Sequence, residues 1–102
     1  MELNVAKKEK SLKSLIELGV KGYFPLFHSS WIEDIYTQEK KYLSKKDQKK
    51  AKEIMNRLLN HRGIERKKII LLSLQEDERK LFIRAFLDMV EGKIIDKRPE
   101  LQ

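Results

Sequence analysis

The sequence contains no cysteine, which excludes disulfide bonds, zinc sites built on thiolates and cysteine nucleophiles. It has only four glycines and two prolines, whereas an all-β sandwich or barrel needs many tight turns. The longest unbroken apolar run is Ile69–Leu72, far shorter than a segment that spans a bilayer. The first ten residues lack the apolar core of a secretory signal. We therefore expect a cytoplasmic protein.

Charged residues are abundant, and one segment holds the positive excess. They make up 38% of the 102 residues, beside 40% hydrophobic residues, and the net charge is +7. That apolar share is enough for the core of one ordinary domain. Residues 38–68 contain 12 of the 23 basic residues and four of the 16 acidic ones, a local net charge of +8. The flanking parts are close to neutral.

The spacing of apolar residues predicts helices along most of the chain. A first helix runs from Leu3 to Leu18, and Gly19 provides a left-handed stop. An apolar connection follows from residue 19 to 29, and we expect it to lie against the core. Ser29 or Ser30 can cap the next helix, and Ser30 with Glu33 matches a capping box.

Three further helices are predicted in the second half of the chain. Ser44 caps one of them, and Gly63 ends it. Residues 64–72 fit a helix or a strand, but a lone strand would have no partner, so we expect a buried helical turn. Ser73 begins the last and clearest amphipathic helix with a second capping box, and Gly92 closes it.

These elements predict an all-α fold. We expect a single small domain of four to five helices over residues 1–92, arranged mostly as an antiparallel bundle because the connections are short. Residues 93–102 are expected to form a C-terminal tail.

No pattern of residues indicates catalysis. His28 and His61 lie in unlike surroundings, and neither has a partner at metal-ligand spacing. The carboxylate clusters 33–34 and 76–78 stand at predicted helix starts, where acids complement the helix dipole. We therefore expect a protein that is not an enzyme and that holds no metal or cofactor.

The basic segment predicts contacts with phosphate groups, which need point charges but no base code. Side chains that read bases are few there, so we expect no sequence specificity. Tyr36 and Tyr42 fit either a stacking platform for single strands or the core. A solvated face, the more usual role of such a charge run, and a surface for an acidic protein remain open as alternatives. The candidate nucleic-acid contacts are Lys45, Lys46, Lys49, Lys50, Lys52 and Arg57.

Large apolar residues are numerous for one small core, so we expect some of them to form an interface in an oligomer. The candidate interface residues are Tyr23, Phe24, Phe27, Trp31, Phe82 and Phe86.

Several blocks of the chain resemble, in order, the helical domain of archaeal GINS subunits, which are small replication-fork proteins. The blocks are a first helix with Glu9, Ser11, Leu12 and Leu15, then FPLFHSSWIEDIYTQEKKYL (24–43), RKKIILLSL (66–74) and EDERKLFIRAFLDMVEG (76–92). The small β-domain that this family usually carries has no room here. The resemblance implies a non-enzymatic replication scaffold subunit that assembles through helix faces with sister subunits and with the replicative helicase.

A second resemblance covers less of the chain. KKYLSKKDQKKAKEIMNRLL (40–59) is similar to the small stalk subunit of archaeal RNA polymerase. Three classes of function therefore stay open: a scaffold subunit, a basic nucleic-acid-binding module, and a small regulator that binds an acidic protein.

Overall fold

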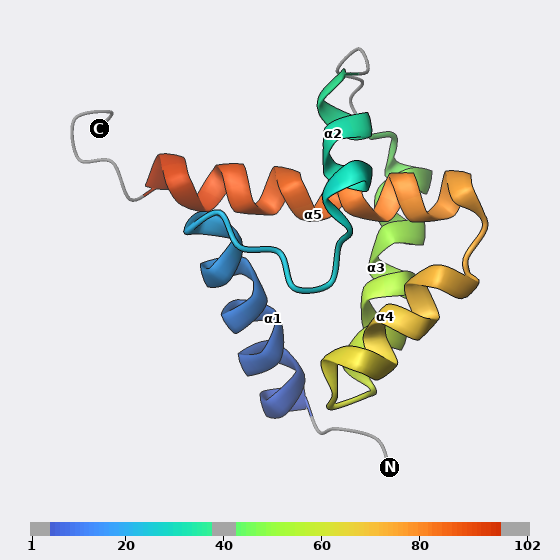
Figure 1. The fold of residues 1–102 in the computed structure, drawn as a ribbon. Helices are drawn as coiled ribbons and strands as arrows, with labels where there is room; N and C mark the ends of the chain where they lie inside the picture. Colours follow the sequence, from blue (N-terminus) through green and yellow to red (C-terminus); the bar gives the residue numbers. More distant parts are fainter. Residues whose placement is uncertain (1–4, 38–42, 97–102) are drawn as a thin grey trace.

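One long helix organises the molecule (Figure 1). The computed structural model describes residues 5–37 and 43–96. Within these residues the chain forms five helices and no strand, which confirms the all-α prediction. No helix in this part of the chain combines the length and the apolarity needed to cross a membrane. The helices are α1 (Val5–Val20), α2 (Ser29–Thr37), α3 (Lys45–Leu59), α4 (Ile64–Ser73) and α5 (Glu76–Asp96).

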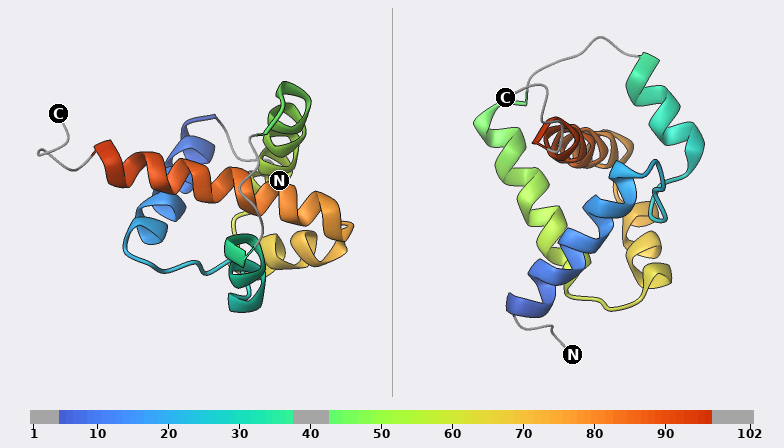
Figure 2. Two further views of the ribbon diagram at one scale, coloured as in Figure 1. Left: turned by 90° about the horizontal axis from the view of Figure 1, so that it is seen from above. Right: turned by 90° about the vertical axis from the view of Figure 1, so that its left-hand side faces the viewer.

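Helices α1, α2 and α3 all contact α5, and α4 contacts α3. The right-hand view of Figure 2 looks along α5 and shows α1, α2 and α3 lying across it. The expected mostly antiparallel arrangement therefore does not describe α5. Its buried side chains cover a wide arc rather than a narrow seam, so the helix can pack against several crossing neighbours. These side chains are Phe82, Ile83, Phe86, Leu87 and Val90.

A cluster of phenylalanine rings lies at the centre of the core. The Phe27 ring meets Phe86 edge-on, with centroids 5.2 Å apart, and meets Phe82 edge-on at 6.1 Å. Phe24 stacks on Phe27 at 6.2 Å. Aromatic pairs in such geometries stabilise a fold beyond the area that they bury. The loop between α1 and α2 therefore belongs to the core, as its apolar composition predicts.

Two arginines of α5 hold the short helix α2. Arg84 Nη2 donates a hydrogen bond to the Ile35 carbonyl at 3.2 Å. The Arg79 guanidinium carbon lies 4.8 Å from the centre of the Trp31 ring, a cation–π contact. A nine-residue helix is marginal on its own. These contacts, together with the burial of Ile35, therefore fix α2 on α5.

Gly19 does not end the first helix, so that prediction is wrong. Helix α1 continues past it, and the residue with positive φ is Gly22, at 88°. A Cβ on Gly19 would lie 2.8 Å from Val90 Cγ2 and 2.9 Å from Phe24 Cε1. Gly19 therefore permits a close approach of α1 to α5. The predicted helix start at Leu3 lies outside the described residues.

Two other glycines also differ from the predicted helix ends. Helix α3 ends earlier, at Leu59, and Gly63 is the N-cap of α4. Gly92 lies inside α5, which continues to Asp96 and so includes the start of the predicted tail. Residues 97–102 lie outside the described part of the chain.

One of the three predicted serine caps is present. Ser44 Oγ accepts a hydrogen bond from the Asp47 N–H at 3.1 Å, which confirms the predicted start of α3. At the start of α2, His28 Nδ1 accepts from the Ser30 N–H at 3.4 Å, so the histidine takes the capping position. Ser73 is the last residue of α4, and its hydroxyl donates to a carbonyl three residues earlier at 2.7 Å. The predicted capping boxes at Ser30 and Ser73 are therefore wrong.

Neighbouring leucines in α4 provide a test of the core. Leu71 is 0% exposed and Leu72 is 64% exposed. Replacing Leu71 with alanine should lower the free energy of unfolding by about 2–5 kcal/mol, because the change leaves a cavity. The matched change Leu72→Ala should stay within about 0.5 kcal/mol. Urea denaturation of both variants measures the two effects, and equal effects would contradict the packing of α4.

Two glycines within helices should respond in opposite ways to alanine. Gly19→Ala should destabilise the protein by about 1–3 kcal/mol, because the new methyl group meets Val90 and Phe24. Nothing lies within 4 Å of a Cβ on Gly92, so Gly92→Ala should stabilise α5 by about 0.5–1 kcal/mol. Thermal unfolding followed by circular dichroism measures both changes. A destabilised Gly92→Ala variant would show that α5 does not continue past residue 92.

Candidate functional site

Helix α3 carries the predicted nucleic-acid contacts and presents all of them to solvent. Its buried stripe fixes one side of the helix, so the basic residues point outward. They do not form one face, because successive residues turn by about 100°. Lys45, Lys49 and Lys52 stand on one side of the stripe. Lys46, Lys50 and Arg57 stand on the other.

The first side borders an apolar groove between α1, α3 and α5. The hollow has a volume of about 680 Å³, and Lys45, Lys49 and Lys52 stand along it together with Gln48. We call it the lysine-rimmed groove. Among the described residues, one acid, Asp88 of α5, also lines it. The other described lining residues are apolar: Leu12, Leu43, Ala51, Met55, Phe82, Ala85 and Met89.

The second side faces acids from α5. Lys50 Nζ forms an ion pair with Glu78 Oε2 at 3.1 Å. A smaller hollow on this side is lined by Lys46, Lys49 and Lys50 together with Asp47, Glu53, Asp77, Glu78 and Leu81. An ion pair this exposed contributes little to stability, but it offsets the positive charge that a phosphate would meet. Of the six predicted contacts, Lys45 and Lys52 therefore border only the groove, and Lys49 borders both hollows. Lys46 and Lys50 stand beside acids, and Arg57 points away from the groove.

The six aromatic residues predicted to form an interface lie mostly inside the molecule. Phe27, Phe82 and Phe86 are buried in the aromatic cluster. Phe24 and Trp31 are half-buried and pack against the core. Tyr23 alone among the six is exposed, with 60% of its surface accessible. The set therefore does not form an exposed face.

Exposed apolar residues lie instead on α4. Ile69 and Leu72, one helical turn apart, are 59% and 64% exposed. The run of four apolar residues, expected to be a buried turn, is thus helical but only partly buried, with Leu71 as its fully buried member.

Tyr36 is exposed near the end of α2, beside acids of α5. Partial burial and the negative charges of Glu91 and Asp88 raise the pKa of its hydroxyl above the ordinary tyrosine value. The same negative charges would repel the phosphates of a nucleic acid stacked on the ring. Tyr36 is therefore poorly placed as a stacking platform, and Tyr42 lies outside the described residues.

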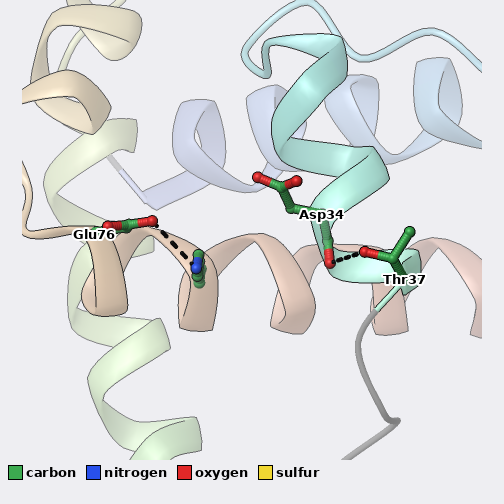
Figure 3. Close-up of polar contacts among 4 residues, drawn as sticks. Asp34, Thr37 and Glu76 are labelled. Atoms are coloured by element: carbon green, nitrogen blue, oxygen red, sulfur yellow. Dashed lines mark hydrogen bonds and ion pairs between the residues drawn. The ribbon is translucent and has the colours of Figure 1, made fainter.

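The two carboxylate clusters do not converge. Cluster 76–78 lies in the first turn of α5 as predicted, but 33–34 lies beyond the first turn of α2, so the predicted helix-start position of 33–34 is wrong. Figure 3 shows Asp34 on α2 and Glu76 on α5; the contact drawn at Asp34 is made by its backbone carbonyl, whereas the contact at Glu76 is made by its carboxylate. The Thr37 hydroxyl donates to the Asp34 carbonyl at 3.0 Å, and Lys80 Nζ pairs with Glu76 Oε1 at 3.2 Å. Over residues 5–37 and 43–96, no three histidine or acidic side chains come together as a metal would need.

Lys67 is a buried charge that the sequence pattern does not mark. Only 2% of the residue is exposed. Its ammonium donates to the carbonyl of His61 and to that of Arg62, the latter at 3.3 Å, in the turn between α3 and α4. Burial lowers the pKa of the Lys67 amine below the ordinary lysine value. In the sequence Lys67 stands between two other basic residues, a pattern that is typical of a surface position.

No protein-family model matches the chain, and no curated protein or solved structure matches it either. The resemblances to the GINS subunits and to the polymerase stalk subunit therefore stay predictions.

The lowered pKa of Lys67 predicts a pH dependence of stability. Between the pKa in the folded protein and the ordinary value of about 10.4, the unfolded chain binds the proton and the folded chain releases it. The free energy of unfolding should therefore rise with pH over this interval, relative to a Lys67→Met variant. Urea denaturation from neutral to alkaline pH measures the difference, with Lys13→Met, at an exposed position of α1, as the control for a lost charge. A difference that falls with pH would contradict the assigned direction.

Proposed function

We propose that this chain is a non-enzymatic docking domain that binds an acidic, amphipathic helix of a partner protein in the lysine-rimmed groove. One observation carries the proposal: Lys45, Lys49 and Lys52 stand along a single edge of an apolar hollow. An apolar floor beside a row of cations is complementary to a helix with apolar residues on one face and acids next to them.

The dimensions and the chemistry of the groove support this occupant. A volume of about 680 Å³ is that of a pocket for a small ligand, so the hollow receives side chains from one face of a bound helix and not the whole helix. Apolar side chains at successive turns of a bound helix can rest on Met55 and Met89, since methionine adapts its shape to a partner. Lysine stems can cover further apolar surface while the ammonium groups reach the acids.

The charges on the two walls of the groove also favour one orientation of the bound helix about its own axis. The three lysines belong to α3, whereas Asp88 belongs to the opposite wall on α5. Acids of the bound helix should therefore face α3, and neutral or basic residues should face Asp88.

Binding to the phosphate backbone of a nucleic acid is the second candidate, favoured by the net charge of +8 over residues 38–68. Acids lie within the basic surface that a phosphate backbone would contact, since Glu53, Asp77 and Glu78 lie beside Lys46 and Lys50. A phosphate backbone also gains nothing from an apolar floor. The groove therefore favours a protein partner.

The two resemblances support the same class of function. A GINS-like scaffold subunit and a polymerase stalk subunit both act by binding partners rather than by catalysis. A docking groove for a helix of a sister subunit or a helicase fits that role.

Two triple variants, each of which removes three positive charges, test the proposal. The rim variant replaces Lys45, Lys49 and Lys52 with alanine, and the balanced-side variant replaces Lys46, Lys50 and Arg57. The ligand is a synthetic helix with leucines on one face and flanking glutamates, measured by fluorescence anisotropy. At about 0.5–1 kcal/mol per charge, the rim variant should bind it about tenfold to a hundredfold more weakly. The balanced-side variant should bind it as the parent does.

Two further measurements separate the candidates. A version of the peptide with lysines in place of the glutamates should not bind, and Met89→Ser should weaken binding of the acidic peptide alone. Duplex DNA is the comparison ligand, with an expected log–log salt slope of about −0.9 per phosphate contact. The docking groove would be rejected if the parent protein did not bind the peptide and the two triple variants lost DNA affinity equally. That result would favour phosphate binding.

A further inference from the structure

A second hollow, separate from the groove, lies between α1 and the turn that joins α3 to α4. Its volume is about 520 Å³, and none of its described lining residues also lines the lysine-rimmed groove. Figure 1 shows the start of α1 and this turn at the same end of the molecule. Three cationic side chains line the hollow, and no acid is among its described lining residues: Lys10, Ser11, Ser14, Leu15, Leu18, Arg62, Ile64 and Lys67.

Lys67 is the buried cationic residue in the lining of this hollow. Its ammonium is held by the carbonyls of His61 and Arg62, and neither of the ion pairs found among the described residues includes it. Carbonyl oxygens solvate a buried charge but do not neutralise it, so an anion nearby would stabilise the folded protein. The lowered pKa of Lys67 agrees with a charge that lacks a counter-ion. The same hydrogen bonds fix the backbone that carries Arg62.

Helix α4 begins beside the hollow and adds to its positive potential; the one acid of its first turn, Glu65, is exposed and is not among the described lining residues. Its N-cap is Gly63, which provides no side-chain hydrogen bond to the first turn. The N–H groups of that turn form the positive end of the helix dipole, and Ile64 of the same turn lines the hollow. Two hydroxyl donors, Ser11 and Ser14, stand opposite on α1.

We propose that this hollow binds a small phosphorylated molecule, with the phosphate between Lys10, Arg62 and the start of α4. A phosphate monoester fits the site because guanidinium and ammonium groups both bind phosphate oxygens, the former through two parallel hydrogen bonds. Leu15, Leu18 and Ile64 form an apolar part of the lining. That part receives the body of the molecule, so an apolar or planar ester binds better than inorganic phosphate. The inference is independent of the docking groove, since the two hollows use different residues.

Titrations of the full chain followed by amide NMR test the site with three ligands: phenyl phosphate, inorganic phosphate and phenol, at constant ionic strength. Phenyl phosphate should give saturable shifts at Ser11, Ser14, Ile64 and the 61–63 turn, and it should bind more tightly than inorganic phosphate. Phenol should not bind there. The proposal would be overturned if the amide shifts occurred at the lysines of α3 instead, or if phenol bound as tightly as phenyl phosphate.

Variants at the rim of the hollow complete the test, since Lys67 itself supports the fold. Arg62→Gln and Lys10→Gln should each weaken phenyl phosphate binding by about tenfold, the usual effect of losing a charge-assisted contact. Lys13→Gln removes an exposed charge of α1 that does not line the hollow and should leave the affinity unchanged. The rim variant of α3 should also retain binding. If Lys13→Gln and Arg62→Gln lowered the affinity for phenyl phosphate equally, binding would depend only on general charge attraction, and the proposed site would be rejected.

Discussion

The edge-on contact of Phe27 with Phe82 and Phe86 is the interaction on which the rest of the arrangement depends. Phe27 lies in a loop, and the two partners lie on α5, so this contact fixes the loop on the long helix. Helices α1 and α2 leave the loop at its two ends and are thereby placed on α5. The placement of α1 brings Leu12 opposite α3, which closes one side of the lysine-rimmed groove. Core packing therefore creates the candidate binding surface.

The periodic apolar residues are sufficient to predict four to five helices, but they do not locate the helix ends. A glycine is compatible with a helix stop and with a close approach of two helices, and only the neighbouring element decides between them. Gly19 faces Val90 of α5, a residue far away in the sequence. Ser44 is a correct prediction because its cap is local, a hydroxyl and an N–H three residues apart. His28 takes the place expected for a serine cap because α2 begins one residue later, at Ser29, and the His28 ring nitrogen accepts from the Ser30 N–H.

The candidate site is predictable only in part for the same reason. The exposure of the α3 lysines follows from the buried stripe of their own helix. The ion pair of Lys50 with Glu78 and the groove floor require residues from other helices, which no local pattern reveals. The number of aromatic residues does not distinguish a core from an interface, so the loop rings predicted for a partner pack against α5. Lys67 lies near an apolar run, yet its burial depends on carbonyls in the preceding turn.

The position of α5 in the chain has a consequence for biosynthesis. This helix contacts α1, α2 and α3, and it follows all of them in the sequence. The ribosome therefore releases these three helices before it releases the helix on which they pack. Until then Phe27 and Ile35 lack the core in which they are buried. The core closes through contacts between the two ends of the described chain, at the entropic cost of closing a long loop. Folding of this domain therefore waits for the synthesis of α5, and until then the nascent chain exposes apolar side chains that a chaperone can bind.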